Sequence, residues 1–353
     1  MKKRNSVFEI LRIVAILMVI LSHYSAYGGV DVPSLSFGLN SIVLNQARLG
    51  DTGVVIFFMI SGFFMVYSTK VSISKIVRLA LTALFFMITF YFISISVGTI
   101  EFSWKGLYLS VMFIFFGEYW FVVTYLLIYI FHPIINKVLL SFTKKELNRF
   151  VLILFVFWSL IPTFTLGMFQ MNNLISVFTL YTFGAYLQLL KDSPLFTKKN
   201  GSLLATFSFI LMMLSVVIIT FIGTKIPAVN EYARQFISRH FPLVILFVTG
   251  LIIVSAKTKP FVFVPINFIA SFTLGIYLIH DNVHFRYYMW QQLIKVPDYA
   301  LGNQLIPHMF LCVLIVFGVS LIIEITRFYA LETPIVLLVR SLQNKRISSK
   351  NIE

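Results

Sequence analysis

Long apolar runs recur from one end of this chain to the other, and they limit the folds open to it more than any other feature. Ten runs have the length that an α-helix needs to cross a bilayer, and short polar segments separate them. Backbone polar groups inside a bilayer must be paired within the protein, so spans of this kind fold as helices. The sequence therefore predicts an all-α, polytopic membrane bundle of about ten transmembrane helices, at residues 6–27, 52–69, 76–97, 119–138, 150–166, 174–190, 202–223, 240–256, 266–284 and 307–328.

The lysines and arginines are distributed unevenly between the segments that separate these runs. Most of the 28 basic residues fall at the N-terminus and in every second connection after it. Cytoplasmic loops carry this excess, so we expect both termini in the cytoplasm and the chain in the plasma (inner) membrane. The apolar stretch 107–116 is too short to span, and counting it as a span would break the pattern, so we interpret it as re-entrant or interfacial.

The formal charge of +15 invites comparison with nucleic-acid-binding proteins. The basic residues lie in short loops between apolar runs, however, which excludes that class. Cys312 is the only cysteine, which excludes an internal disulfide and a multi-cysteine metal site. We divide the chain into a transmembrane domain, residues 1–335, and a basic amphipathic tail, residues 336–353, which we expect on the cytoplasmic surface of the bilayer.

Two ionisable residues, Arg12 and His23, lie inside the first apolar run. Ionisable residues within a bilayer are costly and mark functional sites by default. Eleven residues at about 100° each make about three turns, so the two side chains share one helix face and lie roughly 16 Å apart along the axis. Arginine binds phosphate in a fork, and histidine is a base near neutral pH. The pair therefore predicts an elongated anionic ligand that lies along this helix.

The same two residues also have a purely structural interpretation. Arg12 lies about two turns from the start of the run, so its side chain can reach the inner headgroups. His23 would then sit near the outer interface. The shared face favours the functional interpretation, in which His23 is the catalytic general base and Arg12 binds and orients the anionic ligand.

Segments along the chain resemble, in order, the motifs of the membrane acyltransferase family 3. The first run has the Arg-x10-His spacing of that family, and residues 53–63 resemble its Phe-Phe…Ser-Gly-Phe helix. Later segments resemble its Trp-Phe/Tyr segment, its late Tyr-Leu-x-His helix and its Glu-Thr-Pro ending, at residues 119–133, 271–280 and 332–334. The resemblance extends over residues 6–335, nearly the whole chain.

This resemblance implies transfer of an acyl group, usually acetyl from acetyl-CoA, to a hydroxyl of a surface polysaccharide or of a lipid-linked precursor. Acetyl-CoA is then a co-substrate, and we expect no tightly bound cofactor. Its phosphates would stay at the cytoplasmic face while its pantetheine arm follows the first helix to His23, which would take the proton of the attacking hydroxyl. The candidates for the donor site are Arg12, Lys75, Arg78, Ser61 and Gly62.

The candidates for the acceptor site are Glu118, Trp120, Tyr125 and His280. Many family members carry a glutamate a few residues after the tryptophan, where this chain has residues 122–125 without one. Glu118, just before Trp120, is the candidate replacement. Simpler interpretations exist for some of the donor candidates. Small residues in mid-helix also serve tight packing, and basic residues at helix starts also follow the positive-inside pattern.

A metal site and an exporter are the two other interpretations of this sequence. His280 and His284 have metal-ligand spacing on one helix face, but the sequence offers no third ligand nearby, so we predict no metal site. A non-enzymatic polysaccharide exporter or flippase is the alternative to an enzyme, because ten spans also suit a transporter. Paired, broken helices with a polar midplane would favour it, whereas the polar residues here concentrate in the first run. The sequence leaves the oligomeric state open.

Overall fold

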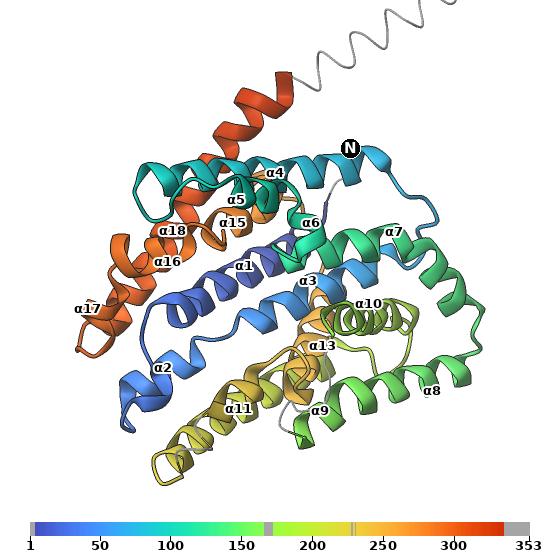
Figure 1. The fold of residues 1–353 in the computed structure, drawn as a ribbon. Coiled ribbons are helices and arrows are strands. Elements are labelled where there is room, and N and C mark those ends of the chain that lie inside the picture. Colours follow the sequence, from blue (N-terminus) through green and yellow to red (C-terminus); the bar gives the residue numbers. More distant parts are fainter. Residues whose placement is uncertain (1–3, 166–171, 227–228, 230, 335–353) are drawn as a thin grey trace, which may run out of the picture.

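The chain forms a bundle of helices in the computed structural model, which describes residues 4–165, 172–226, 229 and 231–334 (Figure 1). These residues form helices and connecting segments without a strand, which confirms the all-α class. The predicted cytoplasmic tail, residues 336–353, lies outside the described residues.

The longer helices are α1 (Ser6–Tyr27), α3 (Gly50–Met65), α4 (Ile73–Ser96), α7 (Trp120–Ser141), α8 (Lys144–Phe155), α10 (Asn173–Leu189), α11 (Lys198–Gly223), α13 (Pro242–Lys257) and α18 (Leu305–Arg327). The short elements between and after them are η1 (Val32–Ser34), α2 (Leu39–Gln46), α5 (Trp104–Val111), α6 (Phe113–Phe116), η2 (Val156–Leu160), α9 (Ile161–Phe164), η3 (Glu231–Ile237), α14 (Val264–Ala270), α15 (Thr273–His280), α16 (Arg286–Tyr288), η4 (Met289–Leu293), α17 (Val296–Ala300) and η5 (Phe328–Glu332).

Within the described residues, eight stretches of helix are long and apolar enough to cross a membrane: Ser6–Tyr27, Leu39–Met65, Ile73–Ser96, Trp120–Ser141, Lys144–Phe164, Lys198–Gly223, Tyr232–Lys257 and Leu305–Glu332. Each overlaps one predicted span. The other two predicted spans, 174–190 and 266–284, correspond to α10, with 17 residues, and to the broken pair α14–α15. Both are shorter than the roughly 20 residues of a typical span. The number of ten spans therefore stays a prediction.

The stretch 107–116 forms two short helices, α5 and α6, of eight and four residues. Helices of this length are too short to cross the bilayer. The hydroxyl of Tyr91 on α4 donates to the carbonyl of Ser103 at 2.7 Å and accepts from its N–H at 2.9 Å, which holds the start of α5 against α4. This segment therefore packs against a spanning helix without adding another one.

Helix α1 lies in the interior of the bundle, between α3 on one side and α15 and α18 on the other (Figure 1). Its start is capped by Asn5, whose side chain accepts a hydrogen bond from the N–H of Val7. Ala15, Ile16 and Ile20 are completely or almost completely buried. Because neighbouring helices surround α1, few of its positions can face lipid. Polar groups on α1 must therefore face protein or a cavity.

Helices α3 and α10 pack backbone against backbone where two glycines meet. A Cβ atom at Gly62 would overlap the carbonyl oxygen of Tyr181, and one at Gly184 would overlap the carbonyl oxygen of Met59. Small residues at such a crossing let two membrane helices approach closely. This crossing fixes α3, which forms one wall of the central cavity described below.

The connecting segments gather at two ends of the bundle (Figure 1). At one end, the N–H of Ser6 donates to the carbonyl of Phe261, and the side-chain amide of Asn136 donates to the carbonyls of Met65 and Ser68. The basic segments that were predicted to share one side of the membrane meet there. We call it the basic end, after Arg4, Lys70, Lys75, Lys144, Lys145, Lys198, Lys199 and Lys257.

We call the other end of the bundle the opposite end. The segments that follow α1, α4, α11 and α15 meet there. Ser94 donates to the carbonyl of His284 at 2.9 Å, and Asn40 donates to the carbonyl of Ala300 at 3.1 Å. Arg48, just before α3, donates to Ser25 near the end of α1. Two ends with separate sets of connections fit a bundle that crosses a bilayer, and the cytoplasmic location of the basic end stays a prediction.

Candidate active site

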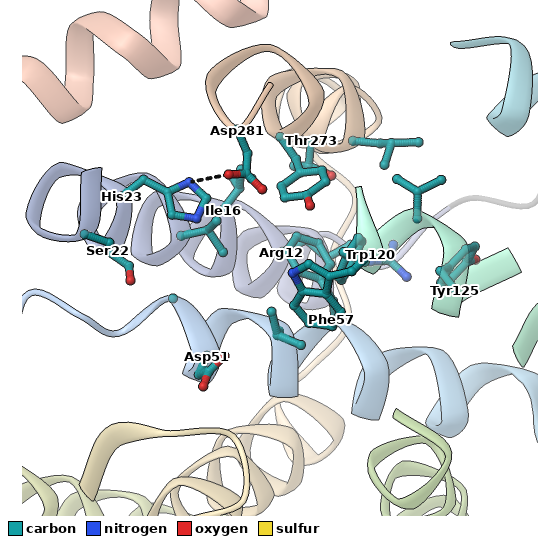
Figure 2. A pocket seen from close by; sticks show the side chains of 18 of the residues that line it. Arg12, Ile16, Ser22, His23, Asp51, Phe57, Trp120, Tyr125, Thr273 and Asp281 are labelled. Carbon is teal, nitrogen blue, oxygen red and sulfur yellow. Dashed lines mark ion pairs between the residues drawn. The ribbon is translucent and has the colours of Figure 1, made fainter. Parts of the chain in front are cut away.

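A cavity of about 510 Å³ lies in the centre of the bundle along α1. This volume lies in the range of sites for small molecules and cofactors. The cavity reaches from Arg4 at the basic end to Arg48 and Arg234 at the opposite end. Its walls come from α1, α3, α7, η3 and the α14–α15 segment, and part of them is seen in Figure 2.

Arg12 and His23 both line this cavity from α1, with Ile16 and Val19 on the wall between them. The shared face predicted from their spacing is therefore present in the fold. Figure 2 shows Arg12 beside Trp120 and Phe57, and His23 farther along the helix beside Asp281. The arrangement joins a cationic group and a titratable base along one continuous space.

Glu9, one turn before Arg12, holds the guanidinium in place. Nη1 of Arg12 lies 2.5 Å from Oε1 of Glu9, whose side chain is 4% exposed. A charge-assisted pair of this kind fixes the position of both groups. A guanidinium has five N–H donors, so the pair still leaves Arg12 with donors for an anion in the cavity. Arg12 lines the cavity, which disfavours the interpretation that it only reaches toward lipid headgroups.

His23 faces a carboxylate that belongs to another helix. Its Nδ1 lies 3.8 Å from Oδ1 of Asp281, and the two side chains are 14% and 6% exposed. This distance exceeds that of a hydrogen bond, but such contacts in substrate-free enzymes often tighten when substrate binds. A proton held on Nδ1 by the carboxylate leaves Nε2 as the basic nitrogen. His23 is thus arranged to accept a proton.

Asp281 is the functional candidate that sequence reasoning did not assign. It follows α15 directly and lies 3.4 Å from Nη1 of Arg286, so its carboxylate is held between a cation and His23. Its one sequence signal is its place next to His280 at the end of an apolar run. That position does not reveal its partner, because the contact with His23 joins the first helix to one near the end of the chain.

His280 lies behind His23 and does not line the cavity. The two ring centroids are 5.0 Å apart, and Nδ1 of His280 lies 2.6 Å from the carbonyl oxygen of Ile276. That hydrogen bond fixes the imidazole of His280. Its Nε2 is buried without a hydrogen-bond partner among the described residues. His280 therefore supports the wall on which His23 lies.

Three further predicted residues, Ser61, Trp120 and Tyr125, line the cavity. The ammonium of Lys75 donates to the hydroxyl of Tyr125 at 3.1 Å and lies 4.1 Å from the ring centroid of Tyr129. Lys75 therefore reaches the cavity through Tyr125, although it does not line it.

The remaining predicted residues lie away from the cavity. Gly62 faces α10, at the glycine crossing described above. Arg78 is 57% exposed and binds Glu332 at 2.5 Å. Glu118 is half-buried and does not line the cavity. These placements favour packing for Gly62 and an ion pair at the basic end for Arg78.

The two histidines with metal-ligand spacing have separate protein partners. Nε2 of His284 lies 2.9 Å from the hydroxyl of Ser110, whereas His280 binds the carbonyl of Ile276. Among the described residues there is no group of three or more His, Cys, Asp or Glu side chains that could hold a metal ion.

The fold and the cavity define a multi-pass, helical membrane protein with an acid–base pair inside it. The family model described as an acyltransferase domain, acyltransferase 3, matches residues 5–325. The chain therefore belongs to the membrane acyltransferase family 3, as the order of its motifs predicts. Neither the curated proteins nor the solved structures contain a match to it. Membership of this family makes the protein an acyltransferase. It does not specify the acyl donor or the acceptor.

Proposed function

We propose that this protein transfers acetyl from acetyl-CoA to a hydroxyl of a cell-surface or lipid-linked polysaccharide, within the plasma membrane. The observation that carries the proposal is the continuous cavity along α1, which joins Arg12 near the basic end to His23 near the opposite end. A long donor with phosphates at one end and a thioester at the other fits such a space. Arg4 and Arg12 are the cations that line its basic end.

In this proposal the donor enters from the basic end and lies along α1. Its phosphates bind the donors that Arg12 does not use for Glu9, together with Arg4. The hydroxyl of Tyr125, which already accepts from Lys75, offers a further polar contact in the same part of the cavity. The thioester then lies farther along the helix, roughly 16 Å away near His23.

His23 acts as the general base in the proposed reaction. Its Nε2 takes the proton of the acceptor hydroxyl as the hydroxyl oxygen attacks the thioester carbonyl carbon. The carbon–sulfur bond then breaks, CoA leaves as thiolate, and the proton passes from His23 to that sulfur. Asp281 stabilises the imidazolium that exists between these two proton transfers. The products are free CoA and the O-acetylated glycan.

The arrangement also lets donor and acceptor approach from different sides. The basic end faces the cytoplasm in the topology that we predict, where acetyl-CoA is made, and the His23 end lies nearer the other side. The acceptor can then reach His23 from the opposite end of the bundle.

The test compares the surface polysaccharide of a deletion strain with that of strains complemented by wild-type protein and by His23→Ala. We expect the deletion strain to keep its polysaccharide but to lose acetyl groups, as a mass difference of one acetyl per modified unit. Wild-type protein should restore that mass, and His23→Ala should not. Loss of the surface polysaccharide itself would instead support the exporter alternative and contradict our proposal.

A further inference from the structure

The cavity has an unusual concentration of arginine at the end where His23 lies. Arg48 and Arg234 line it there, from the segment before α3 and from η3. Arg286 lies just behind the same end, with its guanidinium carbon 4.5 Å from the ring centroid of Tyr27. Arg239 stacks on Trp120, which lies beside Arg12, at 4.4 Å. The donor phosphates, in the proposed function, lie at the far end near Arg12.

The two carboxylates in this part of the cavity already have cationic partners. Oδ1 of Asp51 lies 4.0 Å from Nε of Arg239. The other carboxylate oxygen of Asp51 accepts a hydrogen bond from the backbone N–H of Arg239 at 3.2 Å. Asp281 lies 3.4 Å from Arg286. Both aspartates are therefore neutralised by residues other than Arg48 and Arg234.

Arg48 and Arg234 have no carboxylate within ion-pair distance among the side chains that the structure describes. Arg48 is instead held by neutral groups: its Nε donates to the hydroxyl of Ser25 at 3.2 Å, and that hydroxyl donates to the carbonyl of Leu44 at 2.7 Å. The position of Arg48 is thus fixed, while no carboxylate of the described side chains compensates its charge.

Arg48 and Arg234 line the same cavity, so their two positive charges face one space. An anion bound between two like charges relieves their repulsion. Guanidinium groups bind carboxylates and phosphates in planar, two-pronged contacts, which suits a ligand that must be oriented as well as attracted. The arrangement therefore has the chemistry of an anion site beside the proposed base.

We propose that the acceptor of this enzyme is an anionic glycan, whose carboxylate or phosphodiester binds Arg48 and Arg234 and directs a neighbouring hydroxyl to His23. This inference rests on the proposed function and adds the class of acceptor to it. Both sources of negative charge offer the same oxygens to the two arginines. Chemical removal of the carboxylates or of the phosphodiesters from the glycan distinguishes the two sources.

The test uses purified protein in phosphatidylcholine nanodiscs, so that anionic lipids cannot occupy the site. The acceptor is glycan isolated from the deletion strain, used intact, after reduction of its carboxylates to alcohols, or after cleavage of its phosphodiesters with hydrofluoric acid. Transfer from radiolabelled acetyl-CoA gives the KM of the acceptor and the KM of the donor separately. Wild-type protein, Arg234→Gln and Arg149→Gln are compared.

Arg234→Gln is the preferred variant because Arg234 is exposed and its loss leaves the interior packing intact. Arg149→Gln is the matched control, because it removes the same charge from an exposed position on α8, away from the cavity. For wild-type protein, we expect one of the two chemical treatments to raise the KM of the acceptor about 10-fold. Arg234→Gln should raise the KM of the intact glycan by a similar factor. The KM of acetyl-CoA should stay unchanged. Arg234→Gln should no longer distinguish intact from treated glycan.

Other outcomes overturn the inference in different ways. Equal acceptor KM values for intact and both treated glycans would show that the acceptor's charge is not recognised, while the acetyltransferase function stands. A raised KM for acetyl-CoA in Arg234→Gln would assign these arginines to the donor instead. No transfer by wild-type protein to any of the three glycans would overturn the proposed function and this inference with it.

Discussion

The Nδ1 atom of His23 on α1 lies 3.8 Å from a carboxylate oxygen of Asp281 at the end of α15 (Figure 2). A base that is oriented by a carboxylate and faces a cavity is the arrangement that many acyl-transferring enzymes use. The hydroxyl of Ser61, which also lines the cavity, donates to the carbonyl of Phe57 at 2.8 Å. Direct attack by the acceptor hydroxyl needs only His23 as base, so we propose it as the simpler mechanism.

Asp281→Asn should lower kcat by about 10²-fold or more, because the amide keeps the shape of the carboxylate but cannot stabilise the imidazolium of His23. Donor KM should change little, since Arg12 lies far along the cavity. The measurement is acetyl transfer by purified protein in nanodiscs at saturating acetyl-CoA. Asp298→Asn, at an exposed position on α17, is the matched control. Full activity in Asp281→Asn would remove Asp281 from the mechanism.

Arg12→Lys should raise the KM of acetyl-CoA, because lysine keeps the charge but lacks the planar fork that binds phosphate. The loss of one charge-assisted hydrogen bond costs about 1.5–3 kcal/mol, roughly 10- to 150-fold in affinity. Titration of acetyl-CoA against the purified variant measures this effect. An unchanged dependence on acetyl-CoA would indicate that Arg12 only reaches the headgroups or only pairs with Glu9.

Gly62→Ala should reduce stability, because the new Cβ would overlap the carbonyl oxygen of Tyr181 and separate α3 from α10. Overpacking of this kind costs about 1–3 kcal/mol. We expect a lower thermal midpoint in detergent for this variant and for Gly184→Ala, its counterpart across the crossing. Gly318→Ala on α18 is the control, since a Cβ there meets open space. A stable Gly62→Ala with a raised KM for acetyl-CoA would instead support the donor role suggested by the motif.

The fold class and the pair on α1 could be predicted because each rests on local sequence. Span-length apolar runs require helices in a bilayer, and the 100° turn of a helix places Arg12 and His23 on one face whatever surrounds them. Lengths of single helices were less predictable. The break at Ser271 and Phe272 divides a predicted span into α14 and α15, and apolar composition alone does not reveal such breaks.

The partners of the candidate site could not be predicted, because they come from distant parts of the chain. Asp281 reaches His23 only when α15 packs against α1, and Arg234 reaches the cavity from η3. Motif resemblance also included residues that serve packing or ion pairs, such as Gly62 against α10 and Glu332 with Arg78. A motif shows that residues recur together, and only the fold shows which of them share a cavity.

Single cysteines test the predicted orientation of the bundle. In a Cys312→Ser background, cysteine replaces Lys144, Lys198 or Asn172, and intact cells are treated with a membrane-impermeant thiol reagent. We expect labelling only at position 172, because the basic residues mark the cytoplasmic side. Permeabilised cells provide the control that all three sites can react. Labelling of position 144 in intact cells would reverse the assignment of the basic end.

The most direct measurement is the rate of acetyl transfer from radiolabelled acetyl-CoA to isolated glycan, by wild-type protein and by His23→Ala in the same nanodiscs. We predict that His23→Ala loses about 10²- to 10⁴-fold in kcat, the usual effect of removing a general base. Its thermal midpoint and its binding of acetyl-CoA should match those of wild-type protein. A folded His23→Ala that transfers acetyl at the wild-type rate would contradict the assignment of His23 as the base.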